Sequence, residues 1–366
     1  MITTLLAATL AVGMITPSQS PVQQAMAELV ALGVTGVQVR MHTPRGDWTG
    51  SAGSTRLGDM TPPPTDGRFR AGSVTKTVVS TVVLQLVDDG RIGLDAPVDQ
   101  YLPEFALDHR ITVRMLLQHT SGIFNYTGEP GSPGIPMTGQ PFLDARWHTY
   151  RPADLVRLAL AKPALFEPGT SFSYSNTDYV LAGLLIEKVT GTRYATQVEQ
   201  RILRPLGMRA TFLPGSWPFI PGPHAHGYFR YEKGVVDITA LNPSWAFSAG
   251  EMISTTHDLD TFLAALLGGR LLSPAMLTEM RKPHPVSGYG LGLSQFDAGA
   301  ACGGTVVGHS GSIHGYSTAM YGTADGRMRF EMSVTAGATE IDPTRFAMAE
   351  SKVLGAAFCG NATVTS

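Results

Sequence analysis

The pattern of apolar and polar residues predicts strands at both ends of the chain and helices between them. Residues 21–32 repeat apolar positions at helical spacing, and VTGVQVRM and DWTGSAGS then read as two strands joined by TPRG. From about residue 95 to residue 245 the pattern is helical, with long connections rich in glycine and proline. Strand character returns in YGLGL, GTVVGHSG, GYSTAMYG and MRFEMSVTAG, and a helix is predicted over about 343–358.

This order of elements predicts one discontinuous α/β domain with a helical domain inserted into it. We assign residues 21–90 and 245–360 to the first domain, residues 91–244 to the second, and residues 361–366 to a polar tail. The length of 366 residues agrees with two domains, because domains contain roughly 150 residues each.

The stretch RFRAGSVTK joins an extended segment to a strongly apolar helix. Apolar residues recur at helical spacing from Val74 to Val87, and Gly90 supplies a stop. Ser73 stands where this helix begins, and we expect it to be both an N-cap and a nucleophile placed among free backbone N–H groups. Lys76 lies inside the apolar pattern, where an unpaired charge is costly. Its Cβ would be about 5–6 Å from that of Ser73, which permits proton transfer.

Composition excludes several classes of partner. A net charge of −2 and only 15% charged residues give no basic surface for nucleic acid or for an anionic membrane. The chain contains no CxxC, HExxH or glycine-rich GK[ST] motif, so we predict no cofactor and no metal. His224 and His226 have no third ligand beside them, and alternation along a strand explains the pair. A small, mostly neutral ligand is expected.

The first 20 residues have the outline of a secretory signal peptide, with an apolar stretch from Leu5 to Ile15. They lack a basic residue before that stretch and a clean cleavage pattern, so an ordinary hydrophobic N-terminus is the alternative. No later segment is apolar enough to span a bilayer, and we expect a secreted protein without a stable membrane anchor. In such a chain Cys302 and Cys359 are expected to form a disulfide, the alternative being two free thiols.

Two further stretches could supply partners for Ser73. PGTSFSYSN contains Tyr174-Ser175-Asn176, and VVGHSGS contains His309-Ser310-Gly311 at a strand end. SxxK, then Ser/Tyr-x-Asn, then a Lys/His-x-Gly strand is the order of motifs in penicillin-recognising serine hydrolases. From about Phe69 onward the chain resembles the serine D-alanyl-D-alanine carboxypeptidase and class C β-lactamase family, and looks closest to the secreted actinobacterial carboxypeptidases. LLQHTSGIFNYT, WAFSAGEMISTTHDLDTF and GHSGSIHGY extend the resemblance.

The resemblance implies a fold and a chemistry. The fold is β-lactamase/transpeptidase-like and mixed α/β (α+β), an antiparallel sheet with the N- and C-terminal helices on one face and an inserted, mostly helical domain. The chemistry is attack by Ser73 on a carbonyl group, with Lys76 and Tyr174 as the proton-transfer pair. Either Lys76 or Tyr174 could be the general base, and the residues do not decide between them.

The resemblance also implies a set of substrate-binding residues, namely Asn176, His309, Ser310, Ser312 and Trp245. Asn176 would bind Lys76 and the substrate amide, and the backbone N–H groups of Ser73 and Ser312 would form the oxyanion hole. Trp245 would line the substrate cleft, although a core position is also consistent with its surroundings. His119 in LLQHTSG is expected to cap a helix or to pack.

One position departs from the family pattern. The carboxypeptidases have an arginine directly after the YGLGL segment, which pairs with the terminal carboxylate of the substrate, whereas this chain has Ser294 there. A bidentate charged contact is therefore lost. We expect a terminal carboxylate to be held less tightly, by Ser310, Ser312 and His309 or His314.

The leading prediction is a secreted serine hydrolase of D-Ala-D-Ala-type peptides, such as peptidoglycan stem peptides, that β-lactams also acylate. The alternatives within the enzyme class are a D-stereospecific peptidase, amidase or esterase of the same fold, and a β-lactamase. A different class is a non-catalytic penicillin-binding or cell-wall sensor module. The presence of Ser73, Lys76, Tyr174 and Asn176 together argues against a pure binder.

Overall fold

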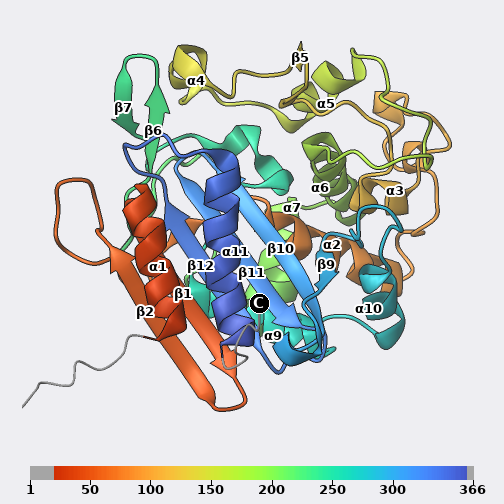
Figure 1. The fold of residues 1–366 in the computed structure, drawn as a ribbon. Helices are drawn as coiled ribbons and strands as arrows, with labels where there is room; N and C mark the ends of the chain where they lie inside the picture. Colours follow the sequence, from red (N-terminus) through yellow and green to blue (C-terminus); the bar gives the residue numbers. More distant parts are fainter. Residues whose placement is uncertain (1–19, 361–366) are drawn as a thin grey trace, which may run out of the picture.

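The computed structural model describes residues 20–360, and a six-stranded antiparallel sheet forms its centre (Figure 1). The strands lie in the order β2 (Gly46–Gly53), β1 (Gly36–Thr43), β12 (Arg329–Thr335), β11 (Tyr316–Thr323), β10 (Thr305–Ile313) and β9 (Ser294–Asp297). β1 pairs with β12 so that Gly36 lies opposite Thr335. The sheet thus joins early and late strands, as the sequence pattern predicts. The expected signal peptide, apart from Ser20, and the polar tail lie outside the described residues.

Helices α1 (Pro21–Leu32) and α11 (Pro343–Cys359) lie side by side across one face of the sheet (Figure 1). Ser20 caps α1 by accepting a hydrogen bond from the N–H of Gln23, and the helix ends at Gly33, whose φ is 113°. Between these helices and the sheet lies a core that includes Met26, Leu29, Val37, Val39, Phe330, Met332 and Val353. The predicted fold class is confirmed.

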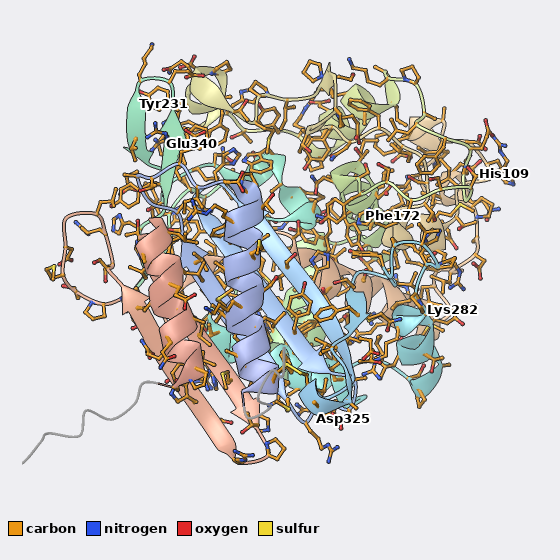
Figure 2. The ribbon with its side chains drawn as sticks, in the orientation of Figure 1. His109, Phe172, Tyr231, Lys282, Asp325 and Glu340 are labelled. Carbon is orange, nitrogen blue, oxygen red and sulfur yellow. A yellow bond between two sulfur atoms is a disulfide. The ribbon has the colours of Figure 1, made fainter. Side chains whose placement is uncertain are left out.

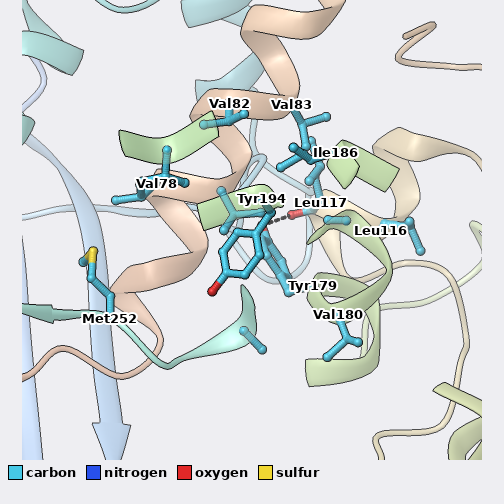
Figure 3. Close-up of a cluster of buried hydrophobic side chains, with 14 of the residues drawn as sticks. Val78, Val82, Val83, Leu116, Leu117, Tyr179, Val180, Ile186, Tyr194 and Met252 are labelled. Atoms are coloured by element: carbon cyan, nitrogen blue, oxygen red, sulfur yellow. Dashed lines mark hydrogen bonds between the residues drawn. The ribbon is translucent and has the colours of Figure 1, made fainter. Parts of the chain in front are cut away.

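The opposite face of the sheet packs against α2 (Val74–Asp88) and α9 (Thr256–Leu267). Nearly every residue of α2 is buried, which agrees with its uninterrupted apolar pattern. α10 (Pro274–Arg281) packs against α2. Figure 3 shows α2 side chains packed against the neighbouring helices through Val78, Val82, Val83, Leu116, Tyr179, Val180 and Ile186. Dense packing on all sides holds the start of α2 in a fixed place.

The chain between α2 and α9 contains a series of short helices separated by long connections. They are α3 (Val113–Gln118), α4 (Gly139–Ala145), α5 (Pro152–Leu160), α6 (Asn176–Thr190), α7 (Tyr194–Val198), a π-helical turn (Glu199–Leu203) and α8 (Arg204–Leu206). Short 3-10 turns lie at Val98–Gln100, Pro103–Phe105, Pro243–Trp245, Phe247–Ala249 and Ala300–Cys302. Figure 2 shows His109 and Phe172 on the helical side of the molecule. The domain boundaries at residues 90 and 245 stay a prediction.

Three small two-stranded sheets lie outside the central sheet. They pair β3 (Phe69–Arg70) with β8 (Ile253–Ser254), β4 (Gly128–Glu129) with β5 (Ser132–Pro133), and β6 (Tyr228–Tyr231) with β7 (Gly234–Asp237). The first of them anchors the segment that leads into α2.

Two strand predictions are wrong. In YGLGL only Tyr289 forms a bridge, and β9 begins after this stretch, at Ser294. Gly292 has a φ of 81°, donates to the carbonyl of Leu117 and accepts from the hydroxyl of Thr77, so the chain turns toward α2 instead of extending. His224 forms only an isolated bridge, so strand alternation does not explain the histidine pair.

Cys302 and Cys359 form the predicted disulfide, which joins the turn before β10 to the end of α11. Within residues 20–360, no helix is long and apolar enough to cross a membrane.

Candidate active site

Ser73 lies at the junction of β3 and α2. β3 pairs with β8, which fixes the extended segment before the helix. Ser73 has helical backbone angles, φ −64° and ψ −8°, and its hydroxyl makes no capping hydrogen bond. The hydroxyl of Thr75 donates to the carbonyl oxygen of Gly72, at 2.6 Å. The N-cap interpretation is therefore wrong for this side chain, whose hydroxyl interacts with Lys76.

The amine of Lys76 is completely buried beside the Ser73 hydroxyl. Its Nζ lies 3.0 Å from Ser73 Oγ, 2.8 Å from Asn176 Oδ1 and 2.7 Å from the carbonyl oxygen of Ala249. Burial lowers the pKa of Lys76 well below its usual value, and the charge of Asp178 opposes this only in part. A neutral amine can donate to the amide and the carbonyl and direct its lone pair at the hydroxyl, as a general base must.

Tyr174 contacts the same pair of groups. Lys76 Nζ lies 4.8 Å from the centre of its ring. Burial raises the pKa of the Tyr174 phenol, and a hydrogen bond with the Ser73 hydroxyl only partly lowers it. The phenol therefore keeps its proton at neutral pH and is available as a proton donor.

His119 holds the backbone on both sides of Tyr174. Its carbonyl oxygen accepts from the N–H of Ser173 at 3.0 Å, and its Nδ1 accepts from the N–H of Ser175 at 3.2 Å. Its ring centre lies 4.2 Å from that of Tyr174. His119 caps the end of α3 with a φ of 60°, which is uncommon for a residue other than glycine. It therefore caps and packs, as expected, and also positions Tyr174.

A buried carboxyl group lies behind His119. Asp178 Oδ1 accepts from Ser121 Oγ at 2.6 Å, and Oδ2 lies 3.2 Å from His119 Nδ1. Burial raises the pKa of Asp178 well above its usual value. The N–H of Ser175 and the Asp178 carboxyl group thus both contact His119 Nδ1. We assigned Asp178 and Ser121 no role from the sequence, although a carboxyl group at the start of the apolar helical pattern of α6 was a usable signal.

Asn176 begins α6, and a neighbouring loop fixes its orientation. Its backbone N–H donates to Asn125 Oδ1 at 3.2 Å, and its Nδ2 donates to Thr127 Oγ1 at 3.3 Å. These contacts turn the Asn176 carbonyl oxygen toward Lys76. Asn125 and Thr127 belong to the SGIFNYT stretch, and the sequence analysis gave neither a role.

His309 faces α2 from β10. It lies opposite Met320 in the sheet, its Nε2 is 2.8 Å from the Tyr289 hydroxyl, and its ring centre is 6.4 Å from that of Tyr174. Burial, with Lys76 nearby, lowers the pKa of His309 to about 4. His309 is therefore close to the predicted site but neutral at pH 7, so it supplies no positive charge for a carboxylate. Tyr289 is a further buried site residue that the sequence analysis missed.

Ser310 and Ser312 direct their side chains to the other face of the sheet. Ser312 lies opposite Ser317, whose hydroxyl donates to Glu350 of α11, and Ser310 shares this face because side chains alternate along a strand. We expected Ser310 to flank the substrate together with His309, whereas its side chain lies on the opposite face of the sheet from that histidine. β9 pairs with β10 only as far as Gly308, so β9 leaves the edge of β10 uncovered at both serines.

Close backbone contacts bring the N–H groups of Ser73 and Ser312 together. A Cβ added at Gly72 would lie 2.8 Å from Ser312 N, and one added at Gly311 would lie 3.0 Å from Ser73 N. Gly72 also has a φ of 52°. Only glycine at these positions lets β10 approach the start of α2 so closely. The two N–H groups are thus near enough to serve one oxyanion.

Trp245 lines a cavity of about 460 Å³ around the turn between β10 and β11, together with Ser312, His314 and Phe346. Trp245 Nε1 and His314 Nδ1 are buried and have no hydrogen-bond partner among the described residues. Burial lowers the pKa of His314 to about 4, so this ring is also neutral. The cavity suits an uncharged, largely apolar group.

The surroundings of the histidine pair and of Ser294 can be read directly from their contacts. Among residues 20–360, no group of three or more His, Cys, Asp or Glu side chains could hold a metal ion. His226 instead contacts Asp237 at 2.6 Å and Arg56 at 3.1 Å. Ser294 Oγ donates to the carbonyl oxygen of Gly308 at 3.2 Å, so this side chain is engaged by the backbone.

Two proteins among the similar solved structures bear on the site. A D-stereospecific amidohydrolase from a Streptomyces species is 42% identical, with a TM-score of 0.84 over 94% of this chain and 100% of that chain. The D-amino acid amidase from Ochrobactrum anthropi SV3, complexed with D-phenylalanine, is 28% identical, with a TM-score of 0.78 over 92% of this chain and 97% of that one.

Sequence comparison points in the same direction. Penicillin-binding protein 4 of Amycolatopsis lactamdurans is 28% identical over 275 residues, which are 69% of this chain and 68% of that protein. The chain spans only 53% and 62% of the lengths of two penicillin-binding relatives from Bacillus subtilis (strain 168). The family model described as Beta-lactamase matches residues 22–343. Since this match covers most of the chain and the fold agrees with it, the protein belongs to the beta-lactamase family of serine hydrolases.

Proposed function

We propose that the protein is a D-stereospecific amidohydrolase that cleaves D-aminoacyl amides and esters through an acyl-enzyme on Ser73. The observation that carries this proposal is the buried amine of Lys76, 3.0 Å from Ser73 Oγ. The similarity to a D-stereospecific amidohydrolase over 94% of the chain supports the choice of substrate class.

Acylation begins with Lys76 as the general base. The low pKa of its buried amine and the raised pKa of the Tyr174 phenol favour neutral Lys76 over a phenolate in this role. The amine removes the Ser73 hydroxyl proton as Oγ forms a bond to the substrate carbonyl carbon. The resulting oxyanion accepts hydrogen bonds from the N–H groups of Ser73 and Ser312, each worth roughly 3–4 kcal/mol in the transition state.

The proton then leaves with the departing group. Tyr174 gives its phenolic proton to the leaving nitrogen or oxygen and takes one from the Lys76 ammonium, as the bond from that atom to the carbonyl carbon breaks. Both Lys76 and Tyr174 are neutral again in the acyl-enzyme. Water attacks the ester by the same route, giving up a proton to Lys76 and releasing the acid and the Ser73 hydroxyl.

The charges around the site favour an amide or ester over a peptide with a free terminal carboxylate. A D-alanyl-D-alanine carboxypeptidase needs a cation for that carboxylate, and Ser294 occupies the place of the family arginine. His309 and His314 both have a pKa of about 4, so neither replaces the arginine. The carboxypeptidase prediction therefore has less support than the amidohydrolase.

The test compares turnover of D-phenylalaninamide, L-phenylalaninamide, acetyl-D-alanyl-D-alanine and nitrocefin by the purified protein. We expect the D-amide to have the highest kcat/KM, and Ser73→Ala to abolish its hydrolysis while the exposed-serine control Ser351→Ala does not. A mass increase on wild type but not on Ser73→Ala, after quenching, identifies the acyl-enzyme. Preferred cleavage of the D-Ala-D-Ala peptide would return the assignment to a carboxypeptidase, and turnover independent of Ser73 would refute both.

We further propose that the protein acts outside the cell and that β-lactams acylate Ser73. The Cys302–Cys359 disulfide supports an oxidising compartment. Labelling with a fluorescent penicillin tests the second proposal, and mass analysis of the protein recovered from culture medium tests the first.

A further inference from the structure

We propose that Glu251 is a positioning residue for the general base. Through its hydrogen bond with the Tyr194 hydroxyl, it holds in place the turn whose carbonyl oxygen, that of Ala249, accepts from the Lys76 amine. This inference rests on the proposed function, in which Lys76 activates Ser73. It concerns a residue to which neither the motifs nor the mechanism gives a role.

Glu251 lies in a segment that runs along the start of α2. The carbonyl oxygen of Ala249, two residues before it, lies 2.7 Å from Lys76 Nζ. The N–H of Met252, the next residue, donates to Thr75 Oγ1 at 3.2 Å. Glu251 therefore lies between two contacts with the helix that carries the general base, so a shift of its backbone would move both contacts.

The turn before Glu251 has a backbone conformation that needs support. Phe247 has a φ of 40°, in the left-handed region that residues other than glycine rarely adopt. Its carbonyl oxygen accepts from the N–H of Glu251 at 3.0 Å. Ser248 Oγ donates to the carbonyl oxygen of Tyr179 at 2.8 Å, which anchors the turn to α6. Such a conformation persists only where surrounding contacts hold it, and the Glu251 side chain supplies a second anchor.

The second anchor is the contact between Glu251 and Tyr194. Both side chains are buried, and the Tyr194 hydroxyl donates to Glu251 Oε1. Tyr194 is the first residue of α7, and its side chain lies among the buried groups near α2 (Figure 3). Its backbone N–H donates to Glu187 Oε1 of α6 at 3.1 Å, and its ring packs against that of Phe247 with the centres 4.6 Å apart. The phenol is thus fixed on two sides and can hold the carboxyl group in one place.

This anchor does not depend on the charge of the carboxyl group. Burial raises the pKa of Glu251 to about 7, although the hydrogen bond from Tyr194 lowers it in part. A carboxyl group can accept a hydrogen bond from a phenol in its charged and in its neutral form, and so can the side-chain carbonyl oxygen of glutamine. Glutamine at this position should therefore preserve the anchor, and alanine should remove it.

The test measures hydrolysis of D-phenylalaninamide by wild type, Glu251→Ala, Glu251→Gln and Tyr194→Phe. Glu251→Ala and Tyr194→Phe should each lower kcat by about 10- to 100-fold and change KM by less than about twofold, because a small displacement of a catalytic group slows the reaction more than it weakens binding. Glu251→Gln keeps the acceptor and should stay within about threefold of wild type. Glu331→Ala removes a buried carboxyl group from β12 instead, and this matched control should leave kcat within about twofold.

The double variant shows whether Tyr194 and Glu251 act as one unit. If they do, Tyr194→Phe combined with Glu251→Ala should cost about as much as the larger single loss, whereas independent effects would multiply. Urea unfolding shows which variants are folded, and Tyr194→Phe, which removes only a hydroxyl group, decides the matter if Glu251→Ala does not fold. Unchanged kcat in Tyr194→Phe, equal losses in Glu251→Gln and Glu251→Ala, or multiplied losses in the double variant would overturn the role of Glu251.

A second substrate separates this inference from the proposed function. Lys76 acts on Ser73 whatever the leaving group, so the same losses should appear with p-nitrophenyl acetate. A wild type that hydrolyses this ester but not D-phenylalaninamide would overturn the proposed function, and the losses on the ester would still decide the role of Glu251. A wild type that hydrolyses neither substrate would overturn both.

Discussion

Replacing Lys76 by methionine should abolish hydrolysis and at the same time stabilise the fold at neutral pH. The side chain is completely buried, and burial holds the pKa of its amine well below the ordinary value of 10.5. In the unfolded chain the same amine is protonated at pH 7. Folding must therefore remove a proton from Lys76, which lowers the free energy of unfolding at pH 7. The same loss of the proton makes the amine reactive as a base.

The magnitude follows from the distance between pH 7 and the unfolded pKa. Each pH unit is worth about 1.36 kcal/mol, so keeping Lys76 neutral at pH 7 costs at most about 5 kcal/mol of unfolding free energy. Methionine removes this cost but leaves Asn176 Oδ1 and the Ala249 carbonyl without their donor, at about 1–1.5 kcal/mol each. The expected net gain for Lys76→Met at pH 7 is about 2 kcal/mol.

The sign of the pH dependence makes the prediction specific. The folded pKa is lowered, so the wild-type penalty is present below the unfolded pKa near 10.5 and disappears as the pH approaches that value. The stability advantage of Lys76→Met should therefore shrink by about 1.36 kcal/mol per pH unit between pH 7 and pH 10. Urea unfolding at pH 7, 8, 9 and 10, followed by tryptophan fluorescence, measures this difference.

A surface lysine provides the control. Lys188 is 53% exposed and lies 3.9 Å from Glu104, so Lys188→Met should change the unfolding free energy by less than about 0.5 kcal/mol at every pH. A Lys76→Met difference that stays constant from pH 7 to pH 10 would contradict the argument, because it would mean that Lys76 is protonated in the folded enzyme.

Three further predictions concern other parts of the molecule. His119→Ala should lower kcat about 10- to 100-fold with little change in KM, because the contacts that hold Tyr174 in place are lost. His119→Asn should retain more activity, because asparagine tolerates the left-handed backbone conformation. Equal losses in both variants would argue against a positioning role. The pKa of buried Glu331 is raised well above its usual 4.5, and both its oxygens lack partners among the described residues. The free energy of unfolding of the wild type should therefore fall as the pH rises from about 4.5. In urea unfolding, Glu331→Gln should be more stable than wild type by about 1–3 kcal/mol at pH 7 but by little at pH 4.5. Replacing Cys302 and Cys359 by serine should cost roughly 2–5 kcal/mol of unfolding free energy for a separation of 57 residues, with kcat at 25 °C unchanged, and a reductant should lower the stability of wild type alone.

Local spacing determined the part of the site that sequence reasoning could place with certainty. Ser73 and Lys76 are three residues apart on one helix, so their contact follows from helix geometry. The face of the sheet on which the serines of β10 lie could not be predicted in the same way. Alternation shows that neighbouring residues lie on opposite faces, but it does not show which face packs against α2. The positions of Ser310 and Ser312 therefore required the structure.

Contacts through space explain the remaining misses. His119 and Asp178 meet only after α3 and α6 pack together, so their contact and the positioning of Tyr174 by His119 were not predicted. The YGLGL stretch alternates like a strand, yet its glycine at position 292 adopts a positive φ and binds the backbone of another segment. Apolar alternation records which residues are buried, and it does not exclude a tightly packed turn.

The pairing of β1 with β12 has a consequence for biosynthesis. Gly36 and Thr335 are sheet partners although 299 residues separate them along the chain. The hairpin of β1 and β2 therefore leaves the ribosome long before β12 is synthesised. Until then the apolar face of β1 stays exposed. A chaperone that covers this face until the last strands are synthesised would raise the yield of active enzyme more than a chaperone that binds the helical segments.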